Sequence, residues 1–305
     1  MAVLQQMVIF FIMMAVGLYA RHKKIITEEN QAQLSSLVVN IAYPAIILSG
    51  AVAGGPHIGG KELAEAAGAA IALLVLALLA AAILARVLGY KKGDNGIARV
   101  MVVFTNIGFM GVPMIAGIYG SGALIYMTVF LIPFNILFFS YAIKTIQGGS
   151  GLSSFSPRDL LNAGMISCFL AIIIYLSDIR LPYVITTAVQ MVGSMTAPLA
   201  MMLMGASLED IRLKELITDK KLIAFSLIKM ILIPVGIVLI LEQFFHNPLL
   251  MAVCMAALAT PSGNVIPLLA SIYNKESYPL SVKGVTLTTV ISVVTMPAAF
   301  YLAGL

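Results

Sequence analysis

Long apolar runs alternate with short polar stretches along all 305 residues of the chain. The hydrocarbon core of a bilayer is roughly 30 Å thick, so about 20 consecutive apolar residues form a helix that crosses it. The pattern therefore predicts an all-α integral membrane protein with ten spanning helices. They lie near residues 2–20, 31–53, 63–88, 97–118, 122–145, 160–177, 182–207, 222–242, 249–273 and 279–303.

Composition supports this class, because 61% of the residues are hydrophobic and only 10% are charged. Such values lie outside the range of soluble domains. The basic stretch 21–24 follows the first apolar run, whereas a secretory signal places its positive charge before the run, so we expect residues 2–20 to be a retained helix. Cys168 and Cys254 lie inside apolar runs with no neighbouring histidine, and we expect no metal ion or other cofactor.

The basic residues alternate between the two ends of the predicted helices. All but three of the 18 Lys and Arg residues lie in or beside the loops that follow the first, third, fifth, seventh and ninth runs; the exceptions are Lys61, Arg180 and Lys229. Cytoplasmic loops are enriched in Lys and Arg, which predicts a cell-membrane protein with both termini outside the cytoplasm. Since these residues are scattered rather than clustered, we expect no nucleic-acid partner.

The two halves of the chain resemble each other. One constant offset aligns Pro44 with Pro198 and Pro113 with Pro267, and the similarity around the second pair extends as far as Tyr273. Each half carries five runs, an odd number, so the second half enters the membrane in the opposite sense. Inverted repeats of this kind are common among secondary transporters. The predicted domains are a first repeat at 1–147, a cytoplasmic connection at 148–159 and a second repeat at 160–305.

Two runs are interrupted near their centres, by residues 106–113 and 260–267. Proline and glycine both disfavour a continuous helix, so we expect the fourth and ninth helices to be broken and to cross. Simple kinks are the alternative interpretation. Paired interruptions at equivalent places in two repeats favour a binding site, because freed backbone at membrane depth survives only where it lines a cavity or is buried in protein.

The predicted site binds an anion. Pro113 and Pro267 suit the first turn of the half-helix that follows each break, and helix N-termini attract a carboxylate. The candidate substrate-binding residues in the breaks are Thr105, Asn106, Gly108, Gly111, Pro113, Ser262, Asn264 and Pro267. Each polar side chain has an alternative role, which is to satisfy the freed backbone.

The second and seventh runs carry the other aligned prolines and supply further candidates: Asn40, Tyr43, Pro44 and Pro198. A hydrogen bond between helices is the alternative role for Asn40 and Tyr43. Gly50 and Gly205 are expected to allow close packing of helices rather than to bind a ligand.

Charge inside the runs is scarce. Each of the 13 acidic residues lies in a loop or near the end of a run, so we expect no carboxylate relay for protons. The carbonyl ends of the first half-helices, near Thr105 and Ala259, leave sodium coupling open. Lys229 lies inside the eighth run, where it either attracts an anion or extends its stem to the membrane interface, and we favour the interface.

Four segments resemble one transporter family: residues 40–44, 105–113 with 119–120, 197–208 and 260–273. Together they are similar to the auxin efflux carrier family, in the compact form found in bacteria, since the long loop of many plant carriers is missing. The resemblance implies elevator-like movement of helices 3–5 and 8–10 against a scaffold of helices 1, 2, 6 and 7. It also implies a small organic anion as substrate and a homodimer in the lipid membrane.

Other functions remain to be separated. A sodium-coupled symporter of the bile-acid type shares the crossed helices, and an anion channel would show pore-lining polar stripes instead of broken repeats. An intramembrane enzyme needs a nucleophile, metal ligands or an acid–base pair, and the centres of the runs contain no His, Asp or Glu. We therefore expect a carrier rather than an enzyme.

Overall fold

The structure, a computed structural model, describes residues 2–52, 59–148, 162–177, 181–207 and 218–305. These residues form helices joined by turns. They contain no β-strand, and one isolated β-bridge pairs two of them. The predicted helical class is thus confirmed. Most of the predicted connection at 148–159 and the basic residue Arg180 lie outside the described residues.

Helix length and composition identify the segments able to cross a membrane. Seven are long and apolar enough: Ala2–His22, Glu28–Val52, Gly60–Val87, Ser121–Ile146, Tyr183–Ala206, Lys220–Leu241 and Tyr278–Leu302. Three shorter apolar segments are Ile107–Tyr119, Ala163–Leu176 and Pro248–Ala259. Each predicted run overlaps one of these segments, and the protein is a multi-pass membrane protein.

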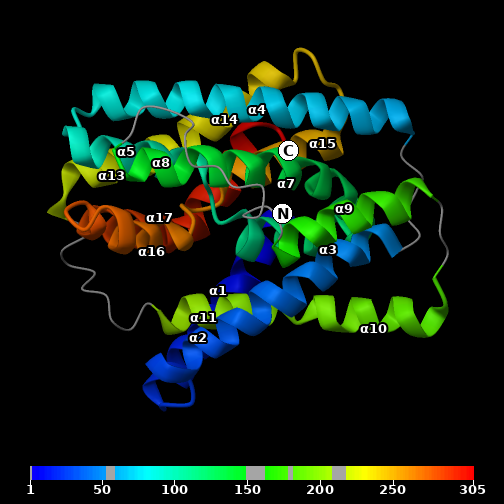
Figure 1. Cartoon of the computed structure of the whole chain (residues 1–305). Coiled ribbons are helices and arrows are strands. Elements are labelled where there is room, and N and C mark those ends of the chain that lie inside the picture. The colour runs from blue at the N-terminus through cyan, green and yellow to red at the C-terminus, as the bar shows by residue number, and fades with distance from the viewer. Residues whose placement is uncertain (1, 53–58, 149–161, 178–180, 208–217) are drawn as a thin grey trace. The chain divides into compact units, whose positions relative to one another are not determined.

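The chain divides into two compact units, and the first takes residues from Met1–Ala66, Gly108–Ile132 and Leu161–Ile211. Its helices are α1 (Ala2–His22), α2 (Glu28–Leu37), η1 (Val38–Ala42), α3 (Tyr43–Val52), α6 (Val112–Tyr119), η3 (Ser121–Ala123), α9 (Ala163–Leu176), α10 (Tyr183–Ser194) and α11 (Thr196–Ala206). Within it, α1 packs on α11, and α3 packs on both α9 and α10 (Figure 1).

Glycines set the close approach of α1 to α11. A β-carbon at Gly17 would overlap the backbone of Met202, and one at Gly205 would overlap the backbone of Met14. Gly50 of α3 lies similarly close to Leu124. Small residues let membrane helices meet backbone to backbone, which increases van der Waals contact where lipid removes the hydrophobic driving force.

The second unit takes residues from Ala67–Ile107, Pro133–Leu160 and Arg212–Leu305. It contains most of α4 (Gly60–Val87), with α5 (Lys92–Val103), η4 (Phe138–Ala142), α8 (Ile143–Ile146), α13 (Lys220–Leu227), η6 (Ile228–Leu232), α14 (Ile233–Leu241), α15 (Pro248–Ala259), α16 (Val265–Tyr273) and α17 (Tyr278–Leu302). Helix α17 packs against α5, α13, η6, α14, α15 and α16. Besides α4, two elements have residues in both units, η2 (Ile107–Gly111) and α7 (Leu124–Leu137).

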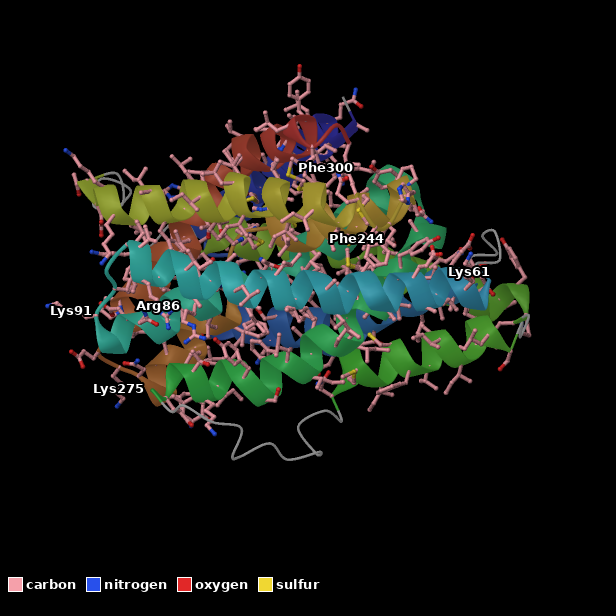
Figure 2. All side chains as sticks on the ribbon, turned by 90° about the horizontal axis from the view of Figure 1, so that it is seen from above. Lys61, Arg86, Lys91, Phe244, Lys275 and Phe300 are labelled. Carbon is pink, nitrogen blue, oxygen red and sulfur yellow. The ribbon has the colours of Figure 1, made fainter. Side chains whose placement is uncertain are left out.

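Basic side chains gather at one end of the second unit. Arg86 at the end of α4, Lys91 before α5 and Lys275 after α16 lie at the same end in Figure 2. All three belong to loops, or flanks of loops, that the Lys and Arg pattern assigns to the cytoplasm.

Three π-helical turns each precede a proline by two residues: η1 precedes Pro44, η2 precedes Pro113 and η6 precedes Pro234. Proline has no N–H and cannot bond the carbonyl four residues earlier. The residue before it reaches back five residues instead, as the N–H of Ile233 does to the carbonyl of Ile228. A widened turn therefore carries the helix past each proline.

Candidate functional site

Two non-helical segments of the second unit meet inside it. Helix α5 ends at Val103 and η2 begins at Ile107, while α15 ends at Ala259 and α16 begins at Val265. The segments between them are named here the first break (104–106) and the second break (260–264). They pair through an antiparallel bridge between Thr105 and Ser262.

Backbone hydrogen bonds hold the two breaks together. The N–H of Asn106 donates to the carbonyl of Pro261 at 2.7 Å, and the N–H of Gly263 donates to the carbonyl of Phe104 at 2.9 Å. Each break thereby satisfies backbone groups that the interrupted helices leave without intrahelical partners.

Side chains make a reciprocal pair of caps at the same place. The hydroxyl of Thr105 donates to the carbonyl of Ala257 at 2.6 Å, in the last turn of α15. The hydroxyl of Ser262 donates to the carbonyl of Met101 at 2.8 Å, in the last turn of α5. Both side chains are buried, so these hydroxyl groups have the backbone-satisfying role that was the alternative to binding substrate.

The other candidates of the second unit lie in or next to the two bridged segments. Asn106 is buried at 6% exposure. Asn264 occupies the N-cap position of α16 and is partly exposed, but its side chain makes no capping hydrogen bond. Pro267 is the third residue of α16, in its first turn. The structure thus brings Thr105, Asn106 and Ser262 together, with Asn264 two residues further on.

Candidates of the first unit form a separate group. A β-carbon on Gly108 would lie 3.3 Å from the ring of Tyr43, and one on Gly164 would lie 3.2 Å from it, so this ring packs against both glycines. Gly111 and Pro113 are buried at the start of α6.

Three further candidates, Asn40, Pro44 and Pro198, belong to the first unit. Pro198 is the third residue of α11 and is exposed, whereas Pro44 is partly buried as the second residue of α3. The side-chain amide of Asn40 is also exposed, and it donates to the carbonyl of Ser36 at 3.0 Å and to its hydroxyl at 3.1 Å. Asn40 therefore bonds within its own helical segment rather than between helices.

Lys229 departs from our expectation. Its side chain is only 1% exposed, and its ammonium donates to the carbonyl of Leu258 at 3.4 Å and to the carbonyl of Thr260. The favoured interpretation, in which the stem extends to the membrane interface, is wrong for this arrangement. The position of Lys229 inside an apolar run was the signal for a special role, but its partners lie on another helix that the sequence does not place beside it.

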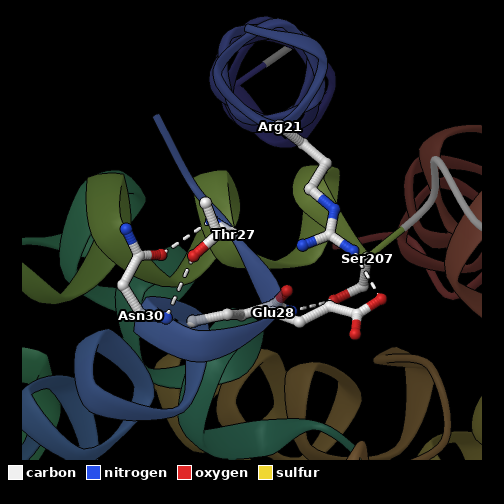
Figure 3. A network of polar contacts seen from close by, with 6 residues as sticks. Arg21, Thr27, Glu28, Asn30 and Ser207 are labelled. Atoms are coloured by element: carbon white, nitrogen blue, oxygen red, sulfur yellow. Dashed lines mark hydrogen bonds and ion pairs between the residues drawn. The ribbon is translucent and has the colours of Figure 1, made fainter. Parts of the chain in front are cut away.

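The first unit also contains a polar network. The guanidinium of Arg21 pairs with Glu28 at 3.3 Å, and Gln31 donates to the hydroxyl of Ser207 at 2.8 Å (Figure 3). Thr27 caps α2 by accepting from the N–H of Asn30. These contacts connect the ends of α1 and α11 to the start of α2 and involve none of the candidate site residues.

In the part of the chain that the structure describes, no group of three or more His, Cys, Asp or Glu could hold a metal ion. Cys168 and Cys254 are both buried and free.

The long apolar helices, together with two halves that match one transport-protein model, identify an integral membrane transport protein. One family model, described as a membrane transport protein, matches the chain twice, at residues 2–153 and 150–300. The chain belongs to this family, the auxin efflux carrier family of membrane transport proteins, as its motifs predicted. No curated protein matches the sequence. Members of the family are transporters rather than enzymes, which agrees with the absence of catalytic groups noted in the runs.

Proposed function

We propose that this protein is a secondary transporter that moves a small organic anion, a carboxylate, across the cell membrane by elevator-like alternating access. The observation that carries the proposal is the pairing of the two breaks through Thr105 and Ser262, in a chain whose two halves match the same transporter family. Paired interruptions at equivalent places of two repeats are typical of transporter substrate sites.

Ten membrane helices in two inverted repeats are part of this proposal. The seven long helices and the three shorter apolar segments supply the crossings. The shorter segments that end or begin at the breaks, Ile107–Tyr119 and Pro248–Ala259, would each be one half of a broken helix. With cytoplasmic loops at the basic end of the second unit, both termini face the outside.

The substrate carboxylate would be held by groups beside the crossing. Asn264 is suited to this role because its side chain does not cap its own helix, and Asn106 lies in the paired break. The N-terminal turn of α16 adds the positive end of a helix dipole. Thr105 and Ser262 support the site by fixing the two helix ends.

The experiment that tests the proposal is uptake of radiolabelled organic anions into proteoliposomes. A panel of mono-, di- and tricarboxylates is offered with and without gradients of sodium and pH. The native protein is compared with Asn106→Ala and Asn264→Ala, and with Asn95→Ala as a matched control in the first turn of α5, away from the breaks.

Saturable uptake of one acid, lost in both break variants but kept in Asn95→Ala, would support the site. Normal uptake in both break variants would contradict it. Non-saturable flux would favour an anion channel, and uptake that requires sodium would favour a symporter of the bile-acid type. Folded protein is verified for every variant by size-exclusion chromatography, so that loss of uptake reports on the site.

A further inference from the structure

Lys229 is buried at the carbonyl end of α15, where the proposed transport site gives it no role. It belongs to η6, the π-helical turn before Pro234. Its ammonium points at the second break and contacts the carbonyls of Leu258 and Thr260, with the sulfur of Met230 at 3.4 Å. Among the described residues no carboxylate forms an ion pair with it.

The carbonyl end of α15 is a place where a cation would be expected. The last carbonyls of a helix have no intrahelical partner and carry the negative end of the helix dipole. Here they are buried: every residue of α15 from Leu250 to Ala259 is enclosed by protein. In transporters with interrupted helices, such half-helix ends and unwound carbonyls coordinate the coupling cation.

The neighbouring carbonyls are already satisfied by neutral donors. The carbonyl of Ala257 accepts from Thr105, and that of Pro261 accepts from the N–H of Asn106. Leu258 and Thr260 are the two that receive the ammonium of Lys229. An ammonium has three donors and no acceptor, so it fits a cluster of carbonyls as a small cation does.

We propose that Lys229 is a tethered cation, held at the carbonyl end of α15 in place of a dissociable one. It acts as a positioning residue, because it fixes the second break through backbone carbonyls and does not touch the substrate. The charge stays with the protein through the transport cycle, so the carrier needs no sodium ion at this end. The statement about sodium rests on the proposed transport function. The binding of a cation at the carbonyl end of α15 does not.

The test uses a cavity that a small cation can fill. In Lys229→Ala the β-carbon remains, and the missing part of the side chain is propylammonium. The full-length protein is purified in detergent and its thermal unfolding is followed in choline chloride, with added propylammonium, with sodium, or with propanol as the neutral molecule of matched shape. Lys220→Ala is the control, since Lys220 is an exposed lysine at the start of the same membrane segment.

We expect the unfolding temperature of Lys229→Ala to fall by about 3 °C or more and to recover with propylammonium but not with propanol. The native protein and Lys220→Ala should respond equally to the two additives. No difference between propylammonium and propanol in Lys229→Ala would overturn the proposal.

A second variant covers the case in which Lys229→Ala does not survive purification. Lys229→Met fills the space of the four-atom stem and removes the ammonium, with its charge and its N–H donors to the carbonyls of Leu258 and Thr260. Unfolding temperature and anion uptake like those of the native protein in Lys229→Met would overturn the proposal, whereas a lowered unfolding temperature that Lys229→Arg restores would support it. Because the melting experiments contain no substrate, they give an answer even if the proposed substrate class is wrong.

Discussion

At the scale of single residues, Ser262 shows how one hydroxyl supports a helix end that lies far away in sequence. Replacing Ser262 with Ala leaves the buried carbonyl of Met101 without its donor, which is expected to cost about 1–3 kcal/mol of stability. Thermal unfolding in detergent measures this loss. Ser271→Ala is the control, because the hydroxyl of Ser271 is exposed and bonds only within its own helix, to Leu268. Equal unfolding temperatures for the two variants would contradict the capping role.

Tyr90, in the loop between α4 and α5, gives a prediction on pH. Burial first, and then the negative charges of Asp219 and Asp94, raise the pKa of Tyr90 well above its ordinary value of 10.0. The unfolded chain releases this proton near pH 10 while the folded chain keeps it, so the contribution of Tyr90 to stability is lost as the pH rises above 10.

Tyr90→Phe is therefore expected to reduce the loss of stability between about pH 9 and 11. At neutral pH the change should be neutral or stabilising, since the buried hydroxyl has no hydrogen-bond partner within the described residues. Unfolding temperatures across this pH range test the expectation, with Tyr183→Phe as a control because Tyr183 is 82% exposed. A steeper alkaline loss in Tyr90→Phe than in the native protein would contradict it.

The residue types of the breaks were predictable from sequence, but not their bonds. Thr and Ser next to an interrupted helix suggest either a ligand or a backbone cap, and nothing local separates the two roles. The acceptors of Thr105 and Ser262 lie in the other repeat, at Ala257 and Met101, so only the folded arrangement decides. Lys229 illustrates the same limit, because its carbonyl partners belong to a different helix.

At the scale of elements, the contact of α1 with α11 depends on two glycines. A side chain at Gly205 has no space against the backbone of Met14. We expect Gly205→Val to force the helices apart and to destabilise the protein by about 1–3 kcal/mol, seen as a lower unfolding temperature.

The matched control is Gly236→Ala in α14, where an added β-carbon meets nothing within 4 Å. Alanine favours a helix over glycine by roughly 1 kcal/mol, so this variant should be as stable as the native protein or more so. If Gly205→Val were equally harmless, the close packing of α1 on α11 would not contribute to stability.

The apolar runs predicted where helices lie in the sequence. They did not predict the irregular turns inside those helices. From glycine and proline the sequence predicted breaks near residues 106–113 and 260–267, and the structure has non-helical segments at 104–106 and 260–264. The sequence did not predict that η1 and η6 pass Pro44 and Pro234 as π-helical turns, because a proline in an apolar run is equally compatible with a kink or a stop. Which of these forms depends on how neighbouring helices satisfy the freed carbonyls.

At the scale of the whole molecule, the repeat and the family could be predicted from the sequence. Aligned prolines and long apolar runs can be recognised without knowing which residues are in contact. The topology depends on how many times the chain crosses the membrane. Three apolar segments are shorter than a spanning helix, Ile107–Tyr119, Ala163–Leu176 and Pro248–Ala259. Each must cross together with adjoining residues if the two repeats are inverted.

Cysteine labelling from one side of the membrane tests this directly. Lys61 and Lys275 are exposed, and all three shorter segments lie between them in the chain. Under the inverted arrangement an odd number of crossings separates the two, so Lys61→Cys should react with an impermeant maleimide in intact cells and Lys275→Cys only after permeabilisation. The native Cys168 and Cys254 are buried and give a low background, which the unmodified protein measures.

The same experiment identifies what fails if the arrangement is wrong. Should one shorter segment not cross, the number of crossings between Lys61 and Lys275 becomes even and both cysteines react from the same side. The second repeat would then not be inverted relative to the first, and the two breaks could not present opposed helix ends to one anion. Labelling from opposite sides would support the inverted repeat. The distribution of Lys and Arg in the loops and the paired interrupted segments would then indicate the same topology.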